Sequence, residues 1–129
     1  MEFEKDLIMR QVRDMARMIA KIVFGKNTAQ YEYQEDTVKL TETDRIYKDL
    51  ICMVDNGKIN EAENYLYDEI EKNAEGNYEI ALGFYDYLNN LPDSFLTENN
   101  YSREEVKEGI QNLAKLKGLA ILGEDLEEF

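Results

Sequence analysis

Histidine and tryptophan are absent from the 129 residues, and cysteine and proline each occur once. Without histidine the chain lacks the commonest general base, the nucleophile–histidine pairs of hydrolases and the usual ligands of catalytic zinc. Cys52 cannot form a disulfide within the chain, and the mixed charges around it give no clear activation of the thiol. We therefore expect a protein that is not an enzyme, with no catalytic residues, no metal and no cofactor. Cys52 is expected to pack beneath a neighbouring element.

Long hydrophobic runs are also missing. The segment that comes closest, residues 7–24, is interrupted by charged side chains that neither the core of a signal peptide nor a membrane span tolerates: Arg10, Arg13, Asp14, Arg17 and Lys21. A lone cysteine without a secretory signal is typical of a reducing compartment. We expect a cytoplasmic protein.

Positive charge is scarce beyond the first 26 residues. The formal net charge is −13, yet residues 1–26 carry six basic and four acidic side chains, whereas residues 27–129 carry nine and 24. Binding of nucleic acid requires clustered Lys and Arg, so the acidic majority of the chain predicts that nucleic acid is not a partner. Solubility alone would also account for such acidity.

Helices are favoured by the scarcity of proline and by the many Glu, Asp and Lys residues. The apolar periodicity predicts helices over residues 4–24, 43–55, 59–73 and 78–91, with a further helix from Ser102 to just before Gly118. Gly76 and Asn77 are expected to separate the third helix from the fourth. Residues 26–43 are predicted to be a connecting loop that either packs along the surface or is mobile, and residues 119–129 an acidic tail. The expected fold is a single all-α domain over residues 1–129.

The helix predicted over residues 4–24 is strongly amphipathic. Its apolar side chains fall within an arc of about 160°, and a basic stripe lies opposite them. Gly25 is expected to be the left-handed residue that ends the helix. The apolar docking stripe comprises Val12, Met15, Met18, Ile19 and Ile22, and the basic stripe comprises Arg10, Arg13, Arg17 and Lys21.

Two further uses of this helix stay open. The like charges of Arg13, Arg17 and Lys21, each four residues apart, favour an anionic neighbour, which the protein's own acidic helices or a second subunit would supply. A methionine-rich stripe also suits an adaptable contact, so the helix is a candidate seam of a homodimer. An anionic membrane surface is disfavoured, because residues 27–129 carry a net charge of −15 and the helix has no tryptophan.

The segment over residues 78–91 has apolar side chains on two sides. One stripe contains Ile80, Phe84 and Leu88, and a second contains Tyr78, Leu82 and Tyr85. A helix of this kind is usually central in a bundle. A more specific hypothesis than a central position is a tyrosine-lined groove, in which Tyr78, Leu82 and Tyr85 bind a partner's helix or extended segment.

Carboxylates are abundant, as in the run of Glu104, Glu105 and Glu108, but they alternate with the apolar stripes. Solvated helix faces have this pattern, whereas a carboxylate metal site needs ligands that converge on one cavity. We interpret these residues as solvent-facing.

The segments GKINEA at residues 57–62 and GNYEIA at residues 76–81 both place Gly and Ala five residues apart. This pattern resembles the small-residue positions of tetratricopeptide helices, although the two copies are 19 residues apart and that repeat has a period of 34. The resemblance implies antiparallel helix hairpins over residues 44–118, following the long N-terminal helix.

The N-terminal segment resembles the opening of an uncharacterised family of small helical bacterial proteins, a domain of unknown function. The residues that carry this resemblance are Phe3, Asp6, Ile8-Met9-Arg10-Gln11, Ala16, Ala20 and Phe24-Gly25-Lys26. It implies a long N-terminal helix that ends in a Phe-Gly-Lys turn and is followed by tetratricopeptide-like helices. It implies no activity.

These observations favour a non-catalytic module for protein–protein interaction, an adaptor whose partner is another protein. The first alternative is a homo-oligomeric structural protein that uses the helix over residues 4–24 as its seam. A peripheral membrane protein comes next, and an enzyme is the least favoured class.

Overall fold

Six α-helices and no strand make up the part of the chain that the computed structural model describes, which is residues 2–32 and 40–119. The all-α class predicted from the sequence is confirmed, while the finer expectation of tetratricopeptide-like hairpins stays a prediction. The predicted acidic tail from residue 120 onward, and residues 33–39 of the predicted loop, lie outside the described residues. The helices are α1 (Glu2–Ile19), α2 (Glu42–Asp55), α3 (Ile59–Lys72), α4 (Ala74–Asn89), α5 (Asp93–Glu98) and α6 (Arg103–Leu116).

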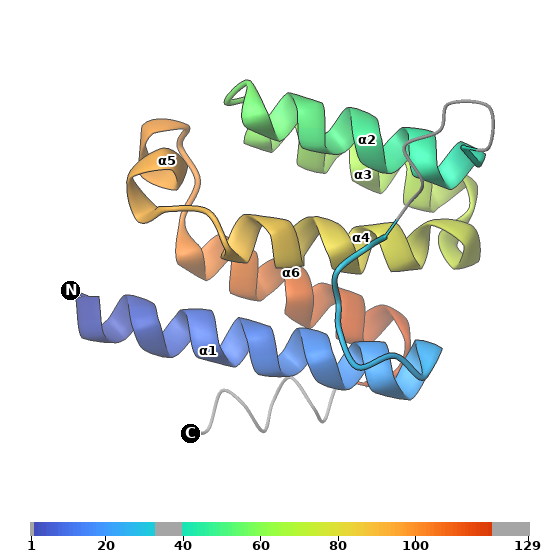
Figure 1. Ribbon diagram of the computed structural model, residues 1–129, viewed down its shortest axis with the longest axis horizontal. Helices are drawn as coiled ribbons and strands as arrows, with labels where there is room; N and C mark the ends of the chain where they lie inside the picture. The colour runs from blue at the N-terminus through green and yellow to red at the C-terminus, as the bar shows by residue number, and fades with distance from the viewer. Residues whose placement is uncertain (1, 33–39, 120–129) are drawn as a thin grey trace.

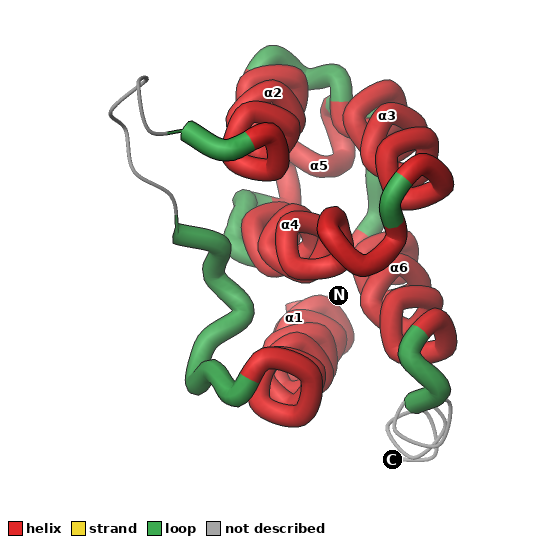
Figure 2. Tube along the Cα trace, turned by 90° about the vertical axis from the view of Figure 1, so that its right-hand side faces the viewer, coloured by secondary structure: helices red, strands yellow, loops and turns green. Residues whose placement is uncertain are grey.

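Helix α4 lies at the centre of the bundle and contacts α1, α2, α3 and α6. It runs between two pairs of helices, with α2 and α3 on one side and α1 and α6 on the other (Figures 1 and 2). Its side chains are apolar around nearly the whole circumference, which matches a helix surrounded by others. The core of the protein is therefore built around α4.

Helix α4 begins four residues earlier than predicted, because Asn73 caps it. The Oδ1 atom of Asn73 accepts a hydrogen bond of 3.0 Å from the backbone N–H of Gly76. A Cβ atom on Gly76 would lie 2.3 Å from the Asn73 side-chain nitrogen, so a larger residue there would displace the capping side chain. The expected break at Gly76 and Asn77 is wrong, since both residues lie within the first turns of α4.

Helix α5 was not predicted from the sequence. It spans six residues after Pro92, which is too short for an apolar period to develop, and it buries a single apolar side chain, Leu96. The predicted start of α6 is confirmed, because the Ser102 hydroxyl accepts a hydrogen bond of 3.2 Å from the backbone N–H of Glu105.

The predicted helix over residues 4–24 forms as α1 followed by one π-helical turn, Ala20–Phe24. Gly25 ends this turn with φ at +67°, as predicted, and its N–H donates to the carbonyl of Lys21 at 3.0 Å. Next to it, the Lys26 ammonium pairs with Glu79 of α4 at 2.7 Å. The described start of the connecting segment therefore packs along α4.

Two glycines allow close approaches that hold the bundle together. A Cβ atom on Gly83 of α4 would lie 2.6 Å from the Cβ of Tyr31, so a side chain there would collide with the connecting segment where it crosses α4. A Cβ atom on Gly109 of α6 would lie 2.1 Å from Cε1 of Tyr85, a side chain that is fully buried. Both contacts require a residue without a side chain.

We predict that Gly109→Ala lowers the free energy of unfolding by about 1–3 kcal/mol, because the new methyl group would overlap the Tyr85 ring in a packed core. Helix propensity alone predicts the opposite sign, since Ala is better than Gly by about 1 kcal/mol in a helix interior. Urea denaturation followed by circular dichroism measures the change.

Lys115→Ala, at an exposed position of the same helix, is the control and should change stability by no more than about 0.5 kcal/mol. A Gly109→Ala protein as stable as the wild type, or more stable, would contradict the contact with Tyr85.

Candidate functional site

The predicted docking stripe of α1 divides between the core and the surface. Val12, Met15 and Ile19 are fully buried, in a helix that packs against α6 and α4. Met18 lies near the edge of the apolar arc and is 44% exposed, whereas Ile22 lies in the π-helical turn and is 59% exposed. Intramolecular docking therefore accounts for three of the five predicted residues.

The basic stripe of α1 faces solvent. All four cations are exposed, and none of the ion pairs within the described residues involves them. The residues are Arg10, Arg13, Arg17 and Lys21.

The predicted tyrosine groove on α4 is wrong, because the bundle itself covers the three residues assigned to it. Tyr78, Leu82 and Tyr85 are each no more than 3% exposed. The Tyr78 hydroxyl donates a hydrogen bond of 2.6 Å to the carbonyl of Leu113 in α6, and its ring lies 6.0 Å from that of Phe24. These side chains belong to the core, and no partner can reach them in this fold.

The hydroxyl of Tyr85 nevertheless connects the core to a polar surface. It donates a hydrogen bond of 2.5 Å to Oε2 of Glu63 in α3, and it lies 3.4 Å from the hydroxyl of Tyr67. Tyr101, from the segment between α5 and α6, donates to the same Oε2 at 3.0 Å. Two phenol hydroxyls therefore hold the Glu63 carboxylate in one position, and burial raises the pKa of Tyr85 and of Tyr101 well above its usual range.

Glu63 lines a groove of about 460 Å³ between α3 and α6. Helix α3 contributes amide and phenol groups beside Glu63, and α6 contributes two further carboxylates and an amide. Desolvation, followed by the charge of Glu63, raises the pKa of Glu105. We call this surface the acidic groove and define it by Asn64, Glu63, Tyr67, Glu105, Glu108 and Asn112.

The acidic groove was not predicted from the sequence. Glu105 and Glu108 were interpreted as parts of a solvated face, and nothing in one helix alone indicates that they face Glu63. The signal that could have suggested the groove is the spacing of polar residues on each helix, three and four apart, at Asn60, Glu63, Asn64 and Tyr67 and at Glu105, Glu108 and Asn112.

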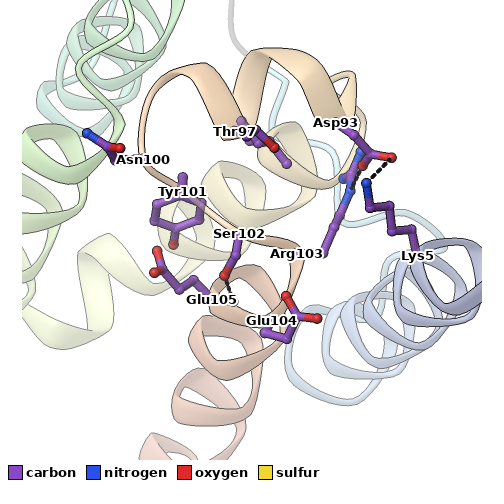
Figure 3. A pocket seen from close by; sticks show the side chains of 10 residues that line it. Lys5, Asp93, Thr97, Asn100, Tyr101, Ser102, Arg103, Glu104 and Glu105 are labelled. Atoms are coloured by element: carbon purple, nitrogen blue, oxygen red, sulfur yellow. Dashed lines mark hydrogen bonds and ion pairs between the residues drawn. The ribbon is translucent and has the colours of Figure 1, made fainter. Parts of the chain in front are cut away.

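A second hollow, of about 320 Å³, lies at the end of the bundle where α1, α5 and α6 meet (Figure 3). Its cation, Arg103, is 5% exposed and is already bound within the chain. Its Nε donates to Asp93 at 2.6 Å, and its Nη1 and Nη2 donate to the carbonyls of Asn89 and Leu91 at 2.8 and 2.5 Å. Lys5 reaches the same aspartate from α1 at 3.8 Å. These bonds give the hollow a structural role.

Cys52 is exposed, which contradicts the expectation that it packs beneath a neighbouring element. The buried face of α2, which contains Leu50 and Val54, packs against α3 and α4, whereas the thiol lies on the other face. The amide nitrogen of Asn56 lies 3.7 Å from its Sγ.

Within residues 2–32 and 40–119, no group of three or more Cys, Asp or Glu side chains is arranged to hold a metal ion. Among the described helices, none is both long enough and apolar enough to cross a membrane.

A protein-family model, described as a family of unknown function (DUF6483), matches residues 2–118. The chain belongs to the DUF6483 family. The family resemblance inferred from the N-terminal segment is thereby confirmed, and the DUF6483 match runs from α1 to the end of α6. No curated protein and no solved structure matches the chain.

We predict that Arg103→Met lowers the free energy of unfolding of this DUF6483 chain by about 2–4 kcal/mol. The substitution leaves two carbonyls and the Asp93 carboxylate without the buried donor that now serves them. Thermal or urea denaturation measures the loss.

Lys5→Met is the matched control, because Lys5 contacts the same aspartate from a half-exposed position. It should cost less than about 1 kcal/mol. Equal losses from the two substitutions would mean that attraction to Asp93, rather than the buried bonds of Arg103, stabilises this end of the bundle.

Proposed function

We propose that this chain is a non-catalytic protein-interaction module whose acidic groove binds a basic, extended segment of a partner protein. The observation that carries the proposal is the Glu63 carboxylate, which two buried tyrosine hydroxyls hold at the groove. Both hydroxyls donate to Oε2, and among the described residues no hydrogen bond reaches Oε1. A partner's ammonium or guanidinium group can therefore bind Glu63 without displacing the tyrosines.

The charges of the groove support a cationic partner. The pKa of Glu105 is raised because desolvation and the neighbouring charge of Glu63 disfavour its ionised form. A lysine or arginine side chain placed between the two carboxylates would offset that repulsion through charge-assisted hydrogen bonds. The net charge of −13 would also attract a basic partner at a distance, more strongly at low ionic strength.

The amides of the groove support an extended segment. Asn64 and Asn112 are exposed on α3 and α6, on opposite sides of the groove. Each amide offers a donor and an acceptor, which is the combination that a peptide backbone requires. Pairing with backbone groups would add affinity that does not depend on the partner's exact sequence.

The tyrosines support a role without catalysis. A tyrosine that acts as a general base or nucleophile needs a lowered pKa, and the burial of Tyr85 and Tyr101 raises theirs. Their hydroxyls serve to position Glu63.

We predict that Glu105→Gln weakens binding of a basic peptide by about tenfold, since it removes one charge-assisted contact. The probe is a fluorescein-labelled nonapeptide with three lysines separated by glycine and serine, and fluorescence polarisation measures its Kd. The same peptide with glutamate in place of lysine should not bind.

Glu104→Gln is the matched control, because Glu104 neighbours Glu105 on α6 but does not line the acidic groove. Its Kd should stay within about twofold of the wild type at equal salt. Equal weakening by the two substitutions would show general attraction to an acidic protein and would refute a specific groove.

The exposed part of α1 favours a second candidate function, self-association. Met18 and Ile22 are 44% and 59% exposed, and Leu7 is exposed on the same side of the helix. Apolar side chains that recur along one exposed face of a helix are typical of a helix–helix contact. We propose a homodimer seam along α1 as this alternative.

For that candidate, we predict that the double substitution Met18→Glu and Ile22→Glu converts a dimer into a folded monomer. Light scattering at several protein concentrations gives the mass, and circular dichroism checks that the helices persist. Met15 and Ile19 are unsuitable for this test, because they are buried and glutamate there would disrupt the core. A wild-type protein that is monomeric at all concentrations would refute the seam.

A further inference from the structure

We propose that a hollow between the connecting segment, α2 and α4 binds an organic cation, an alkylammonium or guanidinium group, through Tyr31, Tyr87 and Asp86. The hollow has a volume of about 380 Å³ and is lined by Tyr31, Tyr47, Tyr87, Asp86 and Asn90, among others. It shares no lining residue with the acidic groove. The inference is therefore independent of the proposed function.

Three separate elements bring the tyrosines together. Tyr31 comes from the connecting segment, Tyr47 from α2 and Tyr87 from α4. Gly83 makes this possible, since a Cβ atom there would lie 2.6 Å from the Cβ of Tyr31 and 3.2 Å from Cε1 of Tyr47. The rings of Tyr31 and Tyr47 then lie 4.7 Å apart, tilted by 42°. The aromatic lining is thus built into the packing of the bundle.

The hydroxyl groups of two of these tyrosines are bound to carboxylates. Tyr31 donates a hydrogen bond to Asp44, and Tyr87 donates one of 2.6 Å to Asp55. A phenol that donates to a carboxylate carries more electron density on its ring. The negative face of a ring is what attracts a cation, so both bonds strengthen the attraction.

Asp86 contributes a carboxyl group to the same hollow. It is partly buried, and burial raises the pKa of its carboxyl group, an effect that the charge of Arg17 on α1 opposes. Among the described residues, no hydrogen bond and no ion pair within 4.0 Å reaches this carboxylate. Among the described residues, the charge that favours its ionised form is that of Arg17, at longer range, and a bound cation would supply a direct partner.

The size and the chemistry of the hollow favour an organic cation over a metal ion or an anion. A volume of about 380 Å³ is in the range of small-molecule pockets and far larger than a metal ion needs. Asp86 and the nearby Asp44 and Asp55 repel anions. Aromatic faces combined with one carboxylate are the usual surroundings of quaternary and alkylated ammonium groups. The same chemistry would be provided by a free small molecule or by a side chain of a partner protein.

The test is a titration of the full chain, labelled with ¹⁵N, with choline, methylguanidinium and the neutral isostere of choline, 3,3-dimethylbutan-1-ol, each up to about 50 mM. We expect at least one of the two cations to shift the amide signals of Tyr31, Tyr87 and Asn90. The neutral alcohol should bind at least about tenfold more weakly than choline, because it matches the shape and lacks the charge. Equal shifts from choline and the alcohol, or none from either cation, would overturn the proposal.

Two substitutions locate the site. Asp86→Asn and Tyr87→Leu should each raise the Kd of the cation by about tenfold or more. Asp68→Asn, at an exposed position of α3, should leave it unchanged. Binding to the Asp86→Asn protein with the wild-type Kd would refute the site, provided that its spectrum shows a folded protein.

A final comparison distinguishes the sources of the cation. A short peptide that carries trimethyllysine is titrated beside free choline. Tighter binding of the peptide supports a protein side chain as the occupant of the site. Tighter binding of choline supports a small molecule.

Discussion

The buried guanidinium of Arg103 is the constraint on which the arrangement of the helices depends. Its donors bind the carbonyl of Asn89 at the end of α4, the carbonyl of Leu91 in the turn that follows, and the side chain of Asp93 at the start of α5, while Arg103 itself begins α6. Asn89, at the end of α4, also donates to the carbonyl of Met9 in α1 at 3.0 Å. Four helices are thus joined at one end of the bundle by a few bonds. A charge in this position is stable only because protein groups replace the water that it loses.

Tyr85 connects α4, in the core, to the surface of the bundle. Its ring occupies the space that Gly109 leaves open in α6, and its hydroxyl reaches the carboxylate of Glu63 in α3. The acidic groove is therefore shaped by the core rather than by loops. Such a surface loses little conformational entropy when a ligand binds, because its groups are already held in place.

Local patterns in the sequence predicted local structure well. The period of α1, the left-handed Gly25 and the start of α6 at Ser102 each depend on a few neighbouring residues, and each is found as expected. The helix break expected at Gly76 is wrong, because Gly76 lies beside the Asn73 side chain that caps α4. The two stripes of α4 could not show whether partners or the chain's own helices cover them. Both candidate sites join residues from helices that are distant in the sequence, and no single-helix pattern predicts which of these meet.

The π-helical turn at Ala20–Phe24 changes the phase of the N-terminal helix. Each residue in such a turn advances by less than the 100° of an α-helix, so the side chains beyond Ile19 are rotated backward relative to the stripe that precedes them. This rotation carries Ile22 away from the core and brings Phe24 to within 6.0 Å of the Tyr78 ring. One irregular turn thus redirects the last side chains of the helix, so that Ile22 faces solvent while Phe24 packs against the core.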